Sequence, residues 1–277
     1  MKPSNRKSFL VAIGFTLASG WIGVGVNRLL GERNSMESPG TLIWLVTPLA
    51  STVADRLIRR NSAPSGWSLA LPRALPWYAV GAVMFPAVTS ISLRFGKAMN
   101  WVDTSGVNKG ALASKAVSSF GPNVAKNVFE EAVWRGYVTN ELQQHRINDG
   151  QLNVTVGLVW GLWHLPYYLF FLPEEEIRQV LDVSRPKFAA IAVGTMVAWT
   201  VPYTELYRLS GSIWPCVLMH AAEDAFVNPL LIDNHVEFNR DRKRFVSPIV
   251  GIIPSALYVA VGLAMRQVRL TTRLGRA

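Results

Sequence analysis

The chain has 277 residues, of which half are hydrophobic and only 17% are charged. Soluble domains carry about 25% charged residues on average, so the composition predicts a polytopic membrane protein with an all-α fold. The net charge of +10 comes from 28 basic and 18 acidic residues. A nucleic-acid binder could show that balance, but it would not place most of its length in apolar runs. We therefore expect basic loops and tails that face an anionic lipid leaflet, and no nucleic-acid partner.

Eight segments are candidates for transmembrane helices, because about 20 apolar residues span a bilayer as a helix. The apolar part of the first, residues 8–26, exceeds the roughly 7–15 residues of a signal peptide core, so we expect a retained membrane helix. The fourth candidate is marked by charge, and hydropathy alone would miss it. The eight candidates are residues 8–30, 41–54, 76–95, 117–143, 152–172, 188–209, 212–232 and 247–266.

The distribution of Lys and Arg predicts the orientation in the membrane. With eight spans, three basic regions fall on one side, which we expect to be the cytoplasm: the N-terminus, the loop at 55–73 and the tail at 266–277. The loop at 235–245 is also basic but falls on the opposite side, which conflicts with this topology.

The first group of ionisable residues is the sequence EEAVWR at 130–135, inside the fourth candidate helix. Ionisable groups in membrane-length apolar segments are costly and are functional candidates by default. Glu131 and Arg135 are four residues apart on one helix face, so we expect them to pair. Glu130 is turned about 100° away, and we expect it to be a free carboxylate that accepts a proton. The alternative is an ion-paired helix face packed against soluble loops.

The second candidate is His164, in the apolar run VTVGLVWGLWHLPYYLFF. It follows Trp160 by one turn and lies beside Gly157 and Gly161, whose small-residue spacing lets helices approach closely. Pro166 would loosen the backbone bonding next to the histidine. We expect His164 to be held against a neighbouring helix, either as a reactive group or as a core histidine that donates to a backbone carbonyl.

The third candidate group is HAAED at 220–224, directly after the apolar run SIWPCVLM. His220 and Asp224 are four residues apart and share a helix face, with Glu223 as an alternative partner for the histidine. The pattern alone is weak, because a satisfied structural histidine would also fit it. Cys216, the only cysteine, lies one turn before His220. A reactive Cys–His pair is conceivable there, but small buried cysteines are common.

Taken together and in this order, the three groups resemble the CPBP family of intramembrane proteases. That family includes the CaaX prenyl endopeptidases of the Rce1 type and bacterial Abi proteins. It carries Glu-Glu-x-x-x-Arg, Phe-x-x-x-His and His-x-x-x-Asn or Asp on separate membrane helices. Trp160 replaces the usual phenylalanine, and Asp224 stands where prenyl endopeptidases usually carry asparagine. The matching positions are Glu130, Glu131, Arg135, Trp160, His164, His220 and Asp224.

The resemblance implies an endopeptidase that hydrolyses a peptide bond of a membrane-associated or lipidated protein. Glu130, assisted by His164, would activate water, and His220 would stabilise the oxyanion. Asp224 would orient His220, and the substitution Asp224→Asn should be tolerated. No metal cofactor is expected. The scaffold of the site would be supported by Glu131, Arg135 and Trp160.

Two other functions stay open at this point. In a zinc-dependent membrane metalloprotease, the ligands would come from Glu130, His164, His220 and Asp224, with one open position. In a non-catalytic membrane module, such as a transporter or a scaffold, the same residues would be a retained site. The second is less favoured, because every motif position holds a chemically able residue.

The resemblance also predicts how the chain is organised. We expect N-terminal membrane helices over residues 1–110, a catalytic helical core over 111–232, and a last membrane helix with a basic tail over 233–277. The expected partners are the lipid bilayer and a lipidated or membrane-embedded protein substrate. The expected location is the plasma (inner) membrane of a bacterium, with both termini in the cytoplasm.

Overall fold

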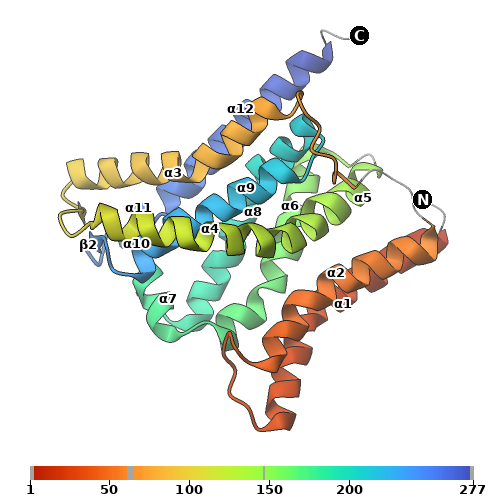
Figure 1. Cartoon of the computed structure of the whole chain (residues 1–277), viewed down its shortest axis with the longest axis horizontal. Helices are drawn as coiled ribbons and strands as arrows, with labels where there is room; N and C mark the ends of the chain where they lie inside the picture. The colour runs from red at the N-terminus through yellow and green to blue at the C-terminus, as the bar shows by residue number, and fades with distance from the viewer. Residues whose placement is uncertain (1–2, 61–64, 146, 275–277) are drawn as a thin grey trace.

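The computed structural model describes residues 3–60, 65–145 and 147–274. Over these residues the chain is built almost entirely of helices (Figure 1). The described strands are β1 (Val102–Asp103) and β2 (Glu237–Phe238), which pair antiparallel with Val102 opposite Phe238. The predicted all-α helix bundle is therefore confirmed, with one small sheet that the sequence did not indicate.

Each of the eight predicted segments contains a helix, although the last begins at Ile252 rather than at residue 247, and several change helix type along their length. The main helices are α1 (Pro3–Leu30), α2 (Pro39–Arg59), α3 (Leu75–Ala98), α4 (Lys109–Glu131), α6 (Asp149–Trp163), α8 (Arg185–Ser210), α9 (Trp214–Ala222) and α12 (Ile252–Leu274). The π-helical segments are η1 (Ala132–Thr139), η2 (Tyr167–Phe171) and η3 (Glu223–Val227). Short α-helices complete the chain: α5 (Asn140–Gln143), α7 (Glu174–Val180), α10 (Asn228–Ile232) and α11 (Lys243–Val246).

The predicted number of eight membrane helices is not confirmed. By length and composition, four helices of the described chain are able to cross a membrane: Arg6–Leu30, Pro39–Arg59, Leu75–Ala98 and Asp149–Phe171. Among the other candidates, α9 has only nine residues before the helix type changes. A helix inside a bundle also carries polar groups that a lipid-facing helix excludes. Its mean hydropathy can therefore fall below that of a lipid-facing membrane helix.

The hairpin of α1 and α2 stands to one side of the other helices in Figure 1. Its two backbones are in direct contact at Gly23 and Gly40. A Cβ added at Gly23 would lie 2.2 Å from the carbonyl oxygen of Gly40. A larger residue at either position would force the two helices apart. The hairpin contacts the core through Trp44, whose ring stacks on Trp163 of α6 with centroids 4.5 Å apart.

The predicted close packing at Gly157 and Gly161 is confirmed, and the neighbouring helix is α8. A Cβ added at Gly157 would lie 2.6 Å from the Cα of Val197, and one at Gly161 would lie 3.0 Å from the Cα of Val193. The two glycines thus let α6 pack directly against the backbone of α8. This contact fixes the end of α6, where His164 follows.

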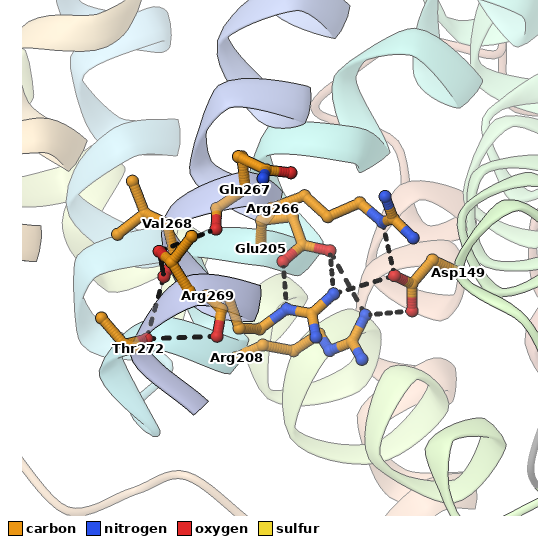
Figure 2. Close-up of polar contacts among 9 residues, drawn as sticks. Asp149, Glu205, Arg208, Arg266, Gln267, Val268, Arg269 and Thr272 are labelled. Carbon is orange, nitrogen blue, oxygen red and sulfur yellow. Dashed lines mark hydrogen bonds and ion pairs between the residues drawn. The ribbon is translucent and has the colours of Figure 1, made fainter. Parts of the chain in front are cut away.

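A network of charges joins α6, α8 and α12, as Figure 2 shows; Glu205 and Arg269 are buried, whereas Asp149 and Arg266 are partly exposed. Asp149 of α6 accepts hydrogen bonds from Arg208 (2.7 Å), Arg266 (2.6 Å) and Arg269 (2.9 Å). The side chain of Glu205, on α8, is fully buried and accepts from Arg269 Nε at 2.5 Å. Several donors on each carboxylate offset the cost of removing these charges from water.

The last predicted membrane segment, which was expected to end at residue 266, continues as a helix into the basic tail. Helix α12 continues to Leu274, and residues 275–277 lie outside the described part of the chain. Within this extension Arg269 is buried and pairs with Glu205 of α8, while the partly exposed Arg266 pairs with Asp149 of α6. Both described ends of the chain lie toward the same end of the molecule in Figure 1.

Candidate active site

The π-helical segments of the described chain coincide with the predicted motifs. Segment η1 begins directly after Glu131, and η3 begins at Glu223. Helix α6 ends at Trp163, and η2 follows His164 by three residues. Isolated π-helical turns inside α-helices occur frequently at functional sites, because the wider turn re-aims side chains. The changes in helix type therefore occur at the three motifs that the sequence indicated.

The predicted pair of Glu131 and Arg135 is present in the structure. Glu131 Oε2 lies 2.9 Å from Arg135 Nε, and both side chains are fully buried. The guanidinium lies between two aromatic rings, 4.8 Å from the centroid of Trp160 and 4.5 Å from that of Tyr203. The ion pair and the two cation–π contacts together hold this charge inside the bundle.

The predicted partner of His220 is wrong. Its Nδ1 lies 3.0 Å from Oε1 of Glu131, so the histidine of the third motif pairs with the first motif. The α-helical spacing that predicted a pair with Asp224 does not persist, because α9 ends at Ala222 and η3 has a wider turn. No hydrogen bond joins His220 to Glu223 or Asp224 in the described chain.

Asp224 is instead fixed by residues of α4 and by its own helix. Its Oδ2 accepts from Asn127 at 2.7 Å and lies 2.8 Å from Lys126 Nζ, while Asn228 donates to Oδ1 at 3.2 Å. Asp224 therefore joins η3 to α4, and its position does not depend on His220. Sequence reasoning missed Lys126, although it precedes Glu130 by four residues and so shares its helix face.

Glu130 was expected to be a free carboxylate, and the structure corrects this for one of its oxygens. Oε2 accepts from the indole nitrogens of Trp134 (3.4 Å) and Trp160 (3.3 Å). No described residue donates a hydrogen bond to Oε1. Glu130 is only 7% exposed, so its unpaired oxygen faces a confined space rather than bulk water.

His164 is the residue at which α6 ends. Its Nδ1 lies 3.0 Å from the carbonyl oxygen of Trp160. A carbonyl oxygen only accepts, so Nδ1 carries the hydrogen and Nε2 is left as an acceptor. His164 therefore donates to a backbone carbonyl through Nδ1, as one of the two expectations had it. Its Nε2 remains able to accept a hydrogen bond or a proton.

One cavity of about 180 Å³ brings the candidate residues together. Its lining includes residues of α4, α6, α9 and η3 that are far apart in the sequence. That volume has room for water as well as for part of a substrate. Much of the remaining lining is apolar and includes Leu172, Phe188 and Ile249. The polar lining includes Lys126, Glu130, Trp160, His164, His220, Glu223 and Asp224.

A metal ion would find its nearest ligand set in the third motif. His220, Glu223 and Asp224 each offer one ligand atom, and these atoms lie within 4.8 Å of one another. That set differs from the predicted zinc ligands, because Glu130 and His164 are not part of it. Lys126 already supplies a positive charge to Asp224, which disfavours a second cation at the same carboxylate.

Cys216 is not arranged as a nucleophile. It is fully buried, and its sulfur lies 3.5 Å from the carbonyl oxygen of Tyr203. Because His220 directs Nδ1 to Glu131, the described contacts show no Cys–His pair. Cys216 thus behaves as a small core residue.

The described chain thus combines a helical bundle, four helices able to cross a membrane, and an internal cavity lined by a buried glutamate and two histidines. Residues 113–226 match the family model described as Rce1-like, type II CAAX prenyl endopeptidase Rce1-like. The match confirms the resemblance carried by the three motifs, and it supports a CAAX-type intramembrane protease at the level of the family. No curated protein matches the chain.

Proposed function

We propose that the protein is an endopeptidase that cleaves its substrate inside the membrane with water activated by Glu130 and His164. The observation that carries the proposal is the different bonding of the two cavity histidines. His164 is left with an acceptor nitrogen, whereas His220 is paired with the carboxylate of Glu131. One histidine is thereby suited to take part in deprotonating water, and the other to carry positive charge.

The first chemical step is the attack of water on the scissile carbonyl carbon. Glu130 Oε1 takes one proton from the water, and His164 Nε2 accepts a hydrogen bond from the same water. The water oxygen forms the new bond to carbon. The carbonyl oxygen becomes an oxyanion. His220 stabilises it as a donor, because Glu131 at 3.0 Å compensates a positive charge on the ring.

In the second step the carbon–nitrogen bond breaks. The proton held by Glu130 passes to the leaving nitrogen, which departs as an amine, and the new carboxyl group remains on the other product. Glu130 returns to its carboxylate form. The reaction consumes one water molecule and requires no other reactant.

A zinc-dependent protease is the second candidate, and the cluster of His220, Glu223 and Asp224 is what favours it. One feature counts against it: Lys126 and Asn127 already occupy Oδ2 of Asp224. We therefore propose a site that works without a resident metal.

The substrate proposed here is a lipidated or membrane-embedded protein. The matching family is named for a prenyl endopeptidase, and the apolar part of the lining suits a lipid or an apolar side chain. We also propose a bacterial plasma membrane with both termini in the cytoplasm. The basic N-terminal and C-terminal segments support the cytoplasmic side, and both described ends of the chain lie toward one end of the bundle. The proposed core over residues 111–232 contains all seven motif residues.

The direct test is cleavage by purified protein in liposomes. The substrates are a farnesylated CaaX peptide, the same peptide without the lipid, and a membrane-anchored reporter peptide. We expect cleavage of at least one lipidated or anchored substrate, unchanged by a chelator and without stoichiometric zinc in the protein. Activity that disappears with zinc on chelation would establish the metalloprotease instead, and no cleavage of any substrate would contradict the proposed function.

A further inference from the structure

Two buried tryptophans contact the same oxygen of the proposed base. The indole nitrogens of Trp134 and Trp160 lie 3.4 Å and 3.3 Å from Oε2 of Glu130. Both tryptophans are fully buried, and an indole N–H can only donate. Glu130 is therefore the acceptor that satisfies both of these buried donors.

The two donors come from different elements. Trp134 lies in η1, one turn after Glu130, whereas Trp160 lies in α6. Their rings contact each other with centroids 6.3 Å apart, and both donate to the same carboxylate oxygen. Because both bonds go to Oε2, the carboxylate cannot rotate freely, and Oε1 is the oxygen left for the cavity.

Trp160 is also the position at which this chain departs from the usual phenylalanine of its motif. A phenylalanine fills a similar volume but offers no hydrogen to a carboxylate. Hydrogen bonds to an ionised group are stronger than those between neutral groups and favour the charged form. The tryptophan therefore adds to this site a donor that the usual residue does not supply.

We propose that Trp134 and Trp160 are positioning residues that hold Glu130 in its charged form with Oε1 directed at the reacting water. The inference rests on the proposed function, since it assigns these residues a role through the base. Trp160 contributes from outside the motif that carries Glu130, so it also couples the position of α6 to that of the base.

The test compares Trp160→Phe with Trp163→Phe in the full-length protein. Trp163 is a buried tryptophan of the same helix, and its N–H donates to the backbone carbonyl of Trp44 at 3.4 Å. Both substitutions remove an indole N–H and the same volume, and both keep an aromatic ring at the position. Only Trp160→Phe removes a donor from Glu130.

For Trp160→Phe we expect kcat/KM below neutral pH to fall about tenfold, with the acidic limb of its pH profile moved up by about one pH unit. The main loss should be in kcat rather than KM. Trp134→Phe should act in the same direction, and the double variant should shift the limb further. Trp163→Phe should leave the limb in place. An unshifted limb in Trp160→Phe and Trp134→Phe would overturn the proposal.

Infrared titration gives the same answer without a substrate. The carboxyl stretch of Glu130 is assigned by difference from Glu130→Gln, and its midpoint should move upward in Trp160→Phe but not in Trp163→Phe. Equal midpoints in the wild type, Trp160→Phe and Trp163→Phe would overturn the positioning role even if cleavage depended on Glu130. Cleavage that survived in Glu130→Gln would instead remove the proposed function, so the two failures are distinguishable.

Discussion

Glu131 joins two motifs through its two oxygens: Oε2 lies 2.9 Å from Arg135 Nε, and Oε1 lies 3.0 Å from His220 Nδ1. One fully buried carboxylate thus pairs with an arginine of η1 and orients a histidine of α9. Carboxylates that bond a reactive histidine fix its tautomer and its ring orientation. Glu131 is therefore more than a scaffold residue, because it sets the donor properties of the proposed oxyanion site.

We expect Glu131→Gln to destabilise the protein and to reduce cleavage strongly. The substitution leaves the buried charge of Arg135 without its partner, which costs about 3–5 kcal/mol. The thermal midpoint of the detergent-solubilised protein should fall clearly. A wild-type midpoint together with full activity would show that the bridge is not needed.

His220→Ala should lower kcat by about 10²-fold or more, as removal of an oxyanion donor does. KM should change little, because the donor acts mainly in the transition state. His145→Ala is the control, since His145 lies in the turn after α5 and is not part of the cavity lining. Similar losses in both variants would indicate a general folding defect rather than a catalytic role.

Asp224→Asn should be tolerated, with less than about a fivefold loss of activity. The amide keeps an acceptor oxygen for Asn127, and the Lys126 side chain, which is 41% exposed, stays hydrated without its ion pair. His220 keeps its contact to Glu131 in this variant. If Asp224→Asn were as damaging as His220→Ala, Asp224 would have to act as a charged ligand or base.

The charged network of α12 should matter more for stability than a surface pair of the same type. Glu205→Gln weakens a carboxylate with a fully buried side chain and leaves Arg269 without a full counter-charge. We expect the free energy of unfolding to fall by about 3 kcal/mol. Glu174→Gln, in a pair that is more than half exposed, should change it by less than about 0.5 kcal/mol. Equal effects would contradict the structural role of the network.

The parts that sequence reasoning predicted correctly depend on local spacing. The pair of Glu131 and Arg135 lies within one helical turn, and Gly157 and Gly161 mark a close helix contact whatever the partner. The contact of Glu131 with His220 joins residues 89 positions apart, so no periodicity could indicate it.

Two further differences have the same physical origin. The π-helical turns are not encoded in the 3.6-residue period on which the pairing of His220 with Asp224 was based. The C-terminal end of α12 was not predicted either. Nothing in the local sequence shows that Asp149 lies beside Arg266, or Glu205 beside Arg269, in the fold. The sequence therefore predicted pairs within one helical turn, but not the partners that tertiary packing brings from distant parts of the chain.

The most direct test of the proposed function is single-turnover cleavage by Glu130→Gln in liposomes. Glutamine keeps the shape of the side chain and an acceptor for the two indole donors, but it cannot take a proton from water. We predict that folding and substrate binding are retained while cleavage falls to background, with or without added zinc. Cleavage close to the wild-type rate would contradict the assignment of Glu130 as the base that activates water.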